Sequence, residues 1–251
     1  MTIYISIWMF IIGTIFGSFY NVVGLRLPKG QSIVSPPSHC PNCNNRLTSL
    51  ELIPIISYVI QKGKCKHCNK KISIVYPVFE IVCGLLFMIS YLVFGFNKEL
   101  IIALTFISML IIIVVSDFNY FIIPDSILII FGILLIIEIA VIKGNIINHL
   151  LNGLWAFIFM FLLKKFGDFL FKKESMGGGD IKLMFIIGLT LSFSKGILSI
   201  FFASFIGLPV SLIYLNKSKD HIIPFGPFLA LGSIIILFTG IDLSTFLNLY
   251  N

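Results

Sequence analysis

The chain has 251 residues, of which 58% are hydrophobic and only 12% are charged. Soluble domains are about half apolar and roughly a quarter charged, so this composition excludes a soluble globular protein and indicates an integral membrane protein. The net charge of +7 requires no nucleic-acid partner, because basic residues collect on the cytoplasmic face of membrane proteins, where they attract anionic lipid headgroups.

Eight apolar runs follow one another along the chain, and each is predicted to be a membrane-spanning helix, which needs about 20 mostly apolar residues. In chain order they cover residues 3–25, 77–96, 99–116, 122–142, 148–167, 181–194, 196–215 and 225–247. The sixth run is short, and its separation from the seventh is the least distinct. The predicted fold class is therefore an all-α polytopic membrane protein of about eight transmembrane helices.

One long polar segment interrupts these runs, from Pro28 to Tyr76. It divides the chain into three predicted parts. Residues 1–27 form the first transmembrane helix, residues 28–76 form a polar loop, and residues 77–251 form a polytopic helical core.

The distribution of Lys and Arg predicts the orientation of the chain in the membrane. If the N-terminus is outside and eight spans alternate, 15 of the 18 basic residues fall on the side of the polar loop. Only Lys98, Lys143 and Lys195 fall on the other side. The polar loop is therefore predicted to be cytoplasmic, with both termini outside.

The polar loop carries four of the five cysteines, in the sequences HCPNC and GKCKHC. Cys40 and Cys43 form one CxxC pair, and Cys65 and Cys68 form the other. Two such pairs are the ligand pattern of a tetrahedral Zn²⁺, and four thiolates leave no open position for catalysis. Because disulfides are disfavoured in the cytoplasm, the sequence predicts a structural zinc site. Metal binding would supply folding energy to a loop too short to build a core.

Three residues close to these motifs have simpler interpretations. His39 and His67 lie beside the thiols and could replace a ligand, but solvated neighbours of the site are the favoured interpretation. Cys83 lies inside the second apolar run, where it is most simply a small buried hydrophobic residue.

Ionisable residues in or near membrane spans are costly, so each is a candidate functional residue. The acidic ones are Glu80, Asp117, Asp125, Glu138, Asp168, Glu174 and Asp180. Asp125 follows Pro124 in the first turn of a predicted helix, where the helix dipole favours a carboxylate. Glu138 lies near the outer end of the fourth run, where it could reach the interface or pair with Lys143, so a structural role is favoured.

Asp117 and Asp180 lie at the cytoplasmic ends of the third and sixth predicted spans. Asp180 could simply cap its helix, whereas Asp117 is at a helix C-terminus, where the dipole disfavours an anion. Water or a proton shared with another carboxylate must offset that cost. Two carboxylates that share a proton can hydrolyse a peptide, because one accepts a proton from water while the other protonates or polarises the carbonyl. On spacing alone, the catalytic and the capping interpretations both stay open.

Five motifs, in order, resemble those of the prepilin leader peptidases, the bifunctional membrane enzymes of type IV pilus, type II secretion and competence systems. The first is GSFYNVVGLRLP at 17–28, and the second is the cysteine loop with SPPSHCPNC, IPIISYVIQKGKCKHC and ISIVYPVFE. SDFNYFIIPD, GGGDIKLM and IPFGPFLALG, the last at 223–232, complete the set. The resemblance covers essentially the whole chain.

The resemblance implies that Asp117 and Asp180 are the catalytic pair. Gly177 and Gly179 fill the glycine positions of GxGD, the signature of membrane aspartyl proteases. Glycines before a catalytic aspartate let a substrate backbone come close, since no Cβ obstructs it. Many relatives have a second acidic residue where this chain has Asn119. The four loop cysteines match the thiols that bind zinc in this family.

The implied substrate is a prepilin or pseudopilin precursor, in which a short basic leader and a glycine precede a long apolar helix. The cut falls after the glycine at the cytoplasmic face of the bacterial cell membrane, with the leader near Glu51, Glu80 or Glu174. The family also methylates the new N-terminus with S-adenosylmethionine. The sequence has no glycine-rich Rossmann fingerprint, and it assigns no residue to this second activity.

Three other classes of protein compete with this interpretation. A GxGD protease of the presenilin or signal-peptide-peptidase type would have a tyrosine-aspartate motif, whereas Asp117 follows Ser116. A transporter would favour acidic residues near the bilayer midplane. A tethered zinc-ribbon binding module would need a basic-aromatic face, and the loop has few aromatic residues.

Overall fold

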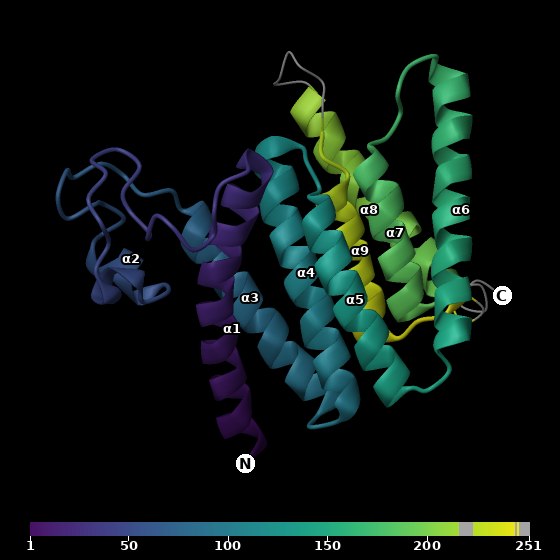
Figure 1. Cartoon of the computed structure of the whole chain (residues 1–251), viewed down its shortest axis with the longest axis horizontal. Helices are drawn as coiled ribbons and strands as arrows, with labels where there is room; N and C mark the ends of the chain where they lie inside the picture. The colour runs from purple at the N-terminus through teal and green to yellow at the C-terminus, as the bar shows by residue number, and fades with distance from the viewer. Residues whose placement is uncertain (216–222, 244, 246–251) are drawn as a thin grey trace. The chain divides into compact units, whose positions relative to one another are not determined.

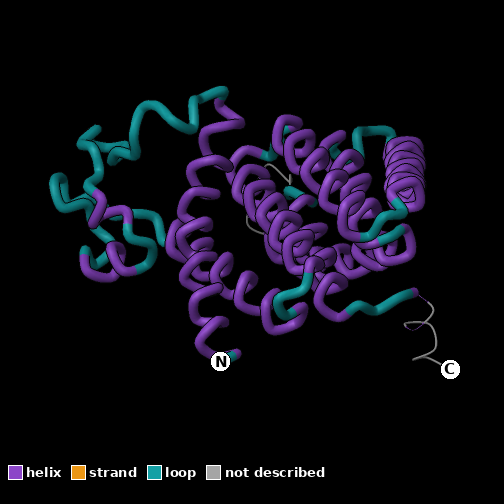
Figure 2. Tube along the Cα trace, turned by 60° about the horizontal axis from the view of Figure 1, so that its bottom comes forward, coloured by secondary structure: helices purple, strands orange, loops and turns teal. Residues whose placement is uncertain are grey.

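A computed structural model describes residues 1–215, 223–243 and 245 of the chain. Every regular element among these residues is a helix (Figure 2). The chain forms two compact units, Met1–Leu100 and Ile101–Asn251. The all-helical membrane class expected from the composition is therefore confirmed.

The first unit consists of two long helices and the polar loop between them (Figure 1). The long helices are α1 (Thr2–Arg26) and α3 (Val75–Phe94), and the loop contains η1 (Leu27–Lys29), η2 (Ser49–Leu52) and α2 (Ile56–Ile60). A Cβ on Gly13 would lie 2.8 Å from the carbonyl oxygen of Cys83, so the two backbones touch where α1 has no side chain. Small residues of this kind allow close packing of membrane helices. Cys83 is fully buried at this contact, as predicted.

The described part of the second unit is a bundle of six helices (Figure 1). They are α4 (Lys98–Tyr120), α5 (Asp125–Ile142), α6 (Ile146–Phe171), α7 (Gly178–Leu191), α8 (Phe193–Leu215) and α9 (Gly226–Thr239). α4 is the most buried of the long helices, and the side chains of Phe106, Ile107 and Leu110 have no exposed surface. α7 packs against α5, α6 and α8, and α8 packs against α9. This packing brings the first turns of α7 and α9 towards the end of α4.

Six of the described helices are long and apolar enough to cross a membrane, so the prediction of about eight spans is not confirmed. α7 and α9 have 14 residues each. At 1.5 Å per residue they are about 21 Å long, which is shorter than the hydrocarbon core of about 30 Å. The run predicted at 225–247 ends as a helix at Thr239, because Gly240 adopts a left-handed conformation. Residues 244, 246 and 247 of that run lie outside the described residues.

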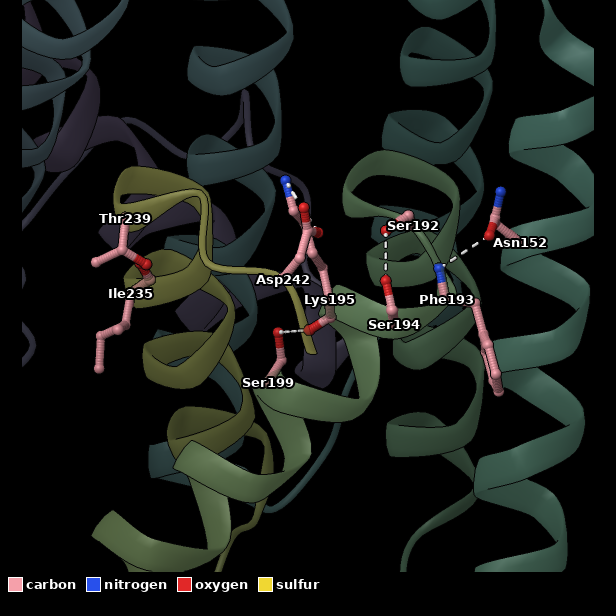
Figure 3. A network of polar contacts seen from close by, with 9 residues as sticks. All are labelled: Asn152, Ser192, Phe193, Ser194, Lys195, Ser199, Ile235, Thr239 and Asp242. Atoms are coloured by element: carbon pink, nitrogen blue, oxygen red, sulfur yellow. Dashed lines mark hydrogen bonds and ion pairs between the residues drawn. The ribbon is translucent and has the colours of Figure 1, made fainter. Parts of the chain in front are cut away.

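Polar contacts at the turn between α7 and α8 explain why the sixth predicted run is separate from the seventh (Figure 3). Ser192 has a φ of 102° and breaks the helix for one residue. The side chain of Asn152 on α6 then accepts a hydrogen bond of 3.0 Å from the backbone N–H of Phe193, the first residue of α8. Lys195 forms an ion pair with Asp242 at 3.7 Å. The short α7 is therefore held at its C-terminal end.

In the structure, α1 and α3 belong to the same compact unit. The division made from the sequence instead places a boundary at residue 76, where the polar loop ends. The division of the chain into residues 1–27, 28–76 and 77–251 describes parts with different functions. It stays a prediction.

Candidate active site and metal site

Asp117 lies in the last turn of α4 and is buried, with 6% of its surface exposed. Its Oδ2 atom accepts a hydrogen bond of 3.1 Å from the backbone N–H of Gly226. Gly226 is the first residue of α9, so the carboxylate at the C-terminus of one helix faces the N-terminus of another. The positive end of the α9 dipole and a free N–H group therefore offset the unfavourable dipole of α4.

Asp180 is the third residue of α7, and it interacts with the backbone N–H of the N-cap residue Gly177. This carboxylate is also buried, with 7% exposed surface, and the charge of Asp117 acts on it. Its Oδ1 atom has no hydrogen-bond partner among the described residues. Buried polar atoms are nearly always paired, so one without a partner indicates a position for water or a ligand.

Asp117 and Asp180 line one cavity of about 690 Å³ within the second unit. Its wall combines the end of α4, the loop before α7, the middle of α8 and the start of α9. The lining residues are Asp117, Phe121, Glu174, Ser175, Met176, Gly177, Asp180, Ala203, Ser204, Gly207, Leu208, Ser211, Ile223, Pro224, Phe225 and Phe228. The cavity is large enough for a short peptide segment and carries two carboxylates on a largely apolar wall.

The glycines before Asp180 have different surroundings. A Cβ on Gly179 would lie 2.8 Å from the Cβ of Ile123, in the turn that follows α4. A Cβ on Gly178 would meet no atom within 4 Å. A Cβ on Gly177 would lie 3.4 Å from Oδ2 of Asp180. Gly179 therefore allows α7 to approach the turn after α4, a packing role that the sequence alone did not indicate.

Two other acidic residues make contacts that differ from those expected. Asp125 begins α5, as predicted, and also forms an ion pair with Lys182 of α7 at 2.7 Å. Glu138 accepts a hydrogen bond of 2.7 Å from the hydroxyl of Thr105, and not from Lys143. Neither residue lines the cavity with Asp117.

The four loop cysteines of the first unit come together in a compact cluster. The sulfur atoms of Cys40, Cys43, Cys65 and Cys68 all lie within 4.8 Å of one another. The Cys40–Cys68 and Cys43–Cys65 sulfurs are 3.9 and 4.0 Å apart. A tetrahedron with Zn–S bonds of about 2.3 Å has edges of about 3.8 Å. The cluster can hold a metal ion.

The two halves of this cluster have the same local structure. The backbone N–H of Cys40 donates to the carbonyl of Asn45, and that of Cys65 donates to the carbonyl of Lys70. Asn44 and Asn69, each one residue after a CxxC pair, both have a positive φ, which Asn tolerates better than most residues. The two CxxC pairs therefore end in equivalent tight turns.

Backbone donors shift the ionisation of two of these thiols towards the thiolate. The backbone N–H groups near Cys40, first that of Asn42, lower the pKa of its thiol. The backbone N–H of Lys70 is the main cause that lowers the pKa of Cys68, to about 6. His39 contacts the carbonyl of Pro37 through Nδ1 at 3.0 Å, which agrees with its interpretation as a neighbour of the site.

Two buried carboxylates in one cavity of a helical membrane protein are typical of the membrane aspartyl peptidases. Two family models match the chain. The bacterial peptidase A24 N-terminal domain matches residues 11–94, and the type IV leader peptidase family matches residues 104–212.

Curated relatives match most of the chain. It is 37% identical over 242 residues to the prepilin leader peptidase/N-methyltransferase of Bacillus subtilis (strain 168), an alignment that covers 95% of this chain and 96% of that protein. Proteins of the same name from Myxococcus xanthus (strain DK1622) and Legionella pneumophila are each 32% identical. These alignments cover 84% and 82% of this chain, and 63% and 73% of those proteins. No solved structure matches the chain.

The chain belongs to the type IV leader peptidase family. The family and the enzyme class inferred from the five motifs are thereby confirmed. Membership of this family decides against a transporter, a tethered zinc-ribbon module and a presenilin-type protease.

Gly226 is a candidate site residue to which the sequence assigned no role. It lies in the motif IPFGPFLALG, where a glycine followed by Pro227 marks the beginning of a helix. That pattern indicates where α9 begins. It does not indicate that the N–H group of Gly226 meets Asp117, 109 residues earlier in the chain.

Proposed function

We propose that this chain is a membrane aspartyl endopeptidase that uses Asp117 and Asp180 to remove the leader from prepilin or pseudopilin precursors. The observation that carries this proposal is the shared cavity, in which the Oδ1 atom of Asp180 is buried without a partner among the described residues. A substrate carbonyl or the attacking water can occupy that position. Family membership supports the reaction and the substrate class.

The two aspartates have complementary surroundings. Asp117 accepts the N–H of Gly226, so it acts as the base that takes a proton from the attacking water. Asp180 carries the shared proton and donates it towards the scissile carbonyl, because Oδ1 is free to do so. Close carboxylates share one proton because both cannot ionise at low cost, and they titrate as a unit.

The substrate enters as an apolar helix with a short basic leader. The apolar part of the cavity wall, with Ala203, Gly207 and Phe228, receives the segment at the cut, and the preceding glycine exposes its carbonyl. Of the three acidic residues considered for the leader, Glu174 lines the cavity and has a side chain 91% exposed. Glu51 and Glu80 are buried and accept hydrogen bonds from their own unit. The leader therefore lies near Glu174.

The cysteine cluster binds a structural Zn²⁺ in this proposal. The sulfur spacing fits a tetrahedral ion, and four thiolates leave no open coordination position. When bound, the ion supplies folding energy to the loop. Cys40, Cys43, Cys65 and Cys68 would hold it, and no chemical step passes through it.

The curated relatives are also named as N-methyltransferases. We include S-adenosylmethionine-dependent methylation of the new N-terminus in the proposal. No residue of the described part of the chain is assigned to the methyl donor. The charge distribution supports a cytoplasmic site and loop in the inner membrane, with both termini outside.

Cleavage of a glycine-containing prepilin precursor in membranes tests the aspartate pair. Asp117→Asn and Asp180→Asn keep the side-chain shape and remove the acid–base function, so each is expected to abolish cleavage. Asp125→Asn is the matched control, because Asp125 lies outside the cavity and is paired with Lys182. Cleavage at the wild-type rate by either of the first two variants, once inserted normally, would show that the pair is wrongly assigned.

A further inference from the structure

The segment Ser49–Ile60 of the polar loop, which comprises η2 and α2, is unusually apolar on its outside. Six of its large hydrophobic side chains are between 37% and 71% exposed: Leu50, Leu52, Ile53, Ile56, Val59 and Ile60. On a water-facing surface, these side chains would leave a large apolar area in contact with solvent. This contiguous surface therefore marks contact with another apolar phase.

The charged side chain of the same segment points the other way. Glu51 is only 8% exposed. Its Oε2 atom accepts hydrogen bonds from the backbone N–H and the hydroxyl of Thr48, at 2.9 and 2.8 Å. The segment thus has its carboxylate inside and its aliphatic groups outside, which is the inverse of a water-soluble surface.

The segment lies beside the apolar middle of α1. Both form the walls of a groove of about 600 Å³, to which α1 contributes Phe10, Ile11, Thr14 and Ile15. These residues precede the basic end of α1 at Arg26 by 11 to 16 positions, which is about 16–24 Å along the helix axis. Half the hydrocarbon core is about 15 Å thick. A segment at that level is at membrane depth, even if α1 is tilted.

Several backbone N–H groups of the segment donate hydrogen bonds within the first unit, as membrane depth requires. The N–H of Ile55 donates to Oε2 of Glu80, a buried residue of α3, at 2.7 Å. Ile55 has a φ of 61°, a strained conformation for a β-branched residue. The N–H groups of Ser57 and Val59 donate to the carbonyls of Ile53 and Ile55. Irregular backbone is tolerated in a bilayer only where its polar groups are satisfied in this way.

We propose that Ser49–Ile60 is a re-entrant segment that dips into the membrane from the side of the polar loop. Its exposed aliphatic side chains, and the groove between it and α1, contact lipid acyl chains. The exposed face of α1 that continues from the groove, including Trp8 and Phe16, is already part of the surface of a membrane span. The inference goes beyond the peptidase activity and does not depend on it.

Basic residues on both sides of the segment fit this placement. Arg46 precedes it, and Lys62, Lys64 and Lys66 follow it. Side chains at these positions reach the headgroups of anionic lipids while the intervening residues enter the hydrocarbon. The cysteine cluster, whose two pairs lie before and after the segment in the sequence, is thereby held at the membrane surface.

Single-tryptophan variants in nanodiscs test the placement. The chain has two tryptophans, so Trp8→Phe and Trp155→Phe provide a background without tryptophan. Into it we would introduce Ile56→Trp or Val59→Trp, at exposed positions that tolerate a larger side chain. The quenchers are phosphatidylcholine brominated on its acyl chains and, separately, aqueous iodide. Nanodiscs expose both faces, so iodide reaches any residue in water.

Two references bracket the result. Native Trp8, retained in a Trp155→Phe variant, is 53% exposed on a membrane span and reports lipid. Val34→Trp, at a position 83% exposed in the polar part of the same loop, reports water. Both test variants are expected to lose as large a fraction of their fluorescence to brominated lipid as Trp8, and to resist iodide. If either of them is instead quenched by iodide like Val34→Trp, and spared by brominated lipid, the segment is not immersed and the proposal is wrong.

Discussion

Gly178 and Gly179 are adjacent, yet alanine is expected to lower activity at Gly179 and to leave it nearly unchanged at Gly178. At Gly179 the added Cβ would lie 2.8 Å from the Cβ of Ile123. Carbon atoms pack at about 3.5–4.0 Å, so α7 and the turn after α4 must separate by about 0.7–1.2 Å. At Gly178 the same atom enters open space. Both substitutions change helix propensity in the same direction, so their difference isolates this contact.

The separation acts on the aspartate pair, because Asp180 follows Gly179 directly and Asp117 lies in the last turn of α4, six residues before Ile123. Overpacking of this size typically costs about 1–3 kcal/mol. A displacement of about 1 Å between reacting groups can lower a rate about 10²-fold, which corresponds to about 2.7 kcal/mol in activation free energy. We therefore expect kcat/KM of Gly179→Ala to fall about 10²-fold, and that of Gly178→Ala to stay close to the wild-type value.

The assay is cleavage of a prepilin precursor by purified enzyme in lipid, with kcat/KM measured for both variants and for the wild type. If Gly179→Ala cleaves as fast as Gly178→Ala, the packing argument is refuted. If Gly178→Ala loses as much activity as Gly179→Ala, the glycines serve the approach of the substrate backbone, as the sequence first suggested. The contact with Ile123 would then be secondary.

Three further changes test other parts of the structure. Gly226→Ala places a Cβ 2.5 Å from Oδ2 of Asp117. The rate of prepilin cleavage should therefore fall about 10²-fold or more, while membrane insertion is unchanged. Cleavage at the normal rate would contradict the role given to Gly226. Cys65→Ser removes one of four ligands of an ion that the wild type should bind at roughly one per chain. The purified variant should lose this zinc, and its loop should become sensitive to protease. Full zinc content would exclude Cys65 as a ligand. Glu80→Leu leaves the N–H of Ile55 without its acceptor and should lower the free energy of unfolding by about 1–3 kcal/mol. Glu80→Gln retains an acceptor oxygen and should lower the free energy of unfolding less. Equal losses in the two variants would exclude the hydrogen bond as the cause.

Much of this protein is determined locally along the chain. The apolar runs specify helices, because a backbone in lipid must satisfy its own hydrogen bonds. The CxxC spacing specifies four thiols that can converge on one ion, because each pair needs only a tight turn. The structure bears out both expectations in the helices α1 and α3 to α9 and in the cysteine cluster.

Other features depend on contacts between residues that are far apart in the sequence. Hydropathy alone could not distinguish a full span from the 14-residue helices α7 and α9, because most residues of both helices are apolar, as in a full span. The turn at Ser192 and the left-handed Gly240 decide where these helices end. Likewise, the apolar residues of Ser49–Ile60 suggested no location until the groove with α1 placed them beside a membrane span.

The sequence by itself determined the membrane class, the four cysteines of the candidate metal site and the two candidate aspartates, because each depends on residue type and short-range spacing. Only the tertiary structure decided that Asp117 faces the N-terminus of α9 and shares a cavity with Asp180. It also showed that the missing side chain of Gly179 makes room for Ile123. The physical reason is that the environment of a buried carboxylate is set by helix ends and backbone N–H groups brought together in packing, and no local pattern records which ends will meet.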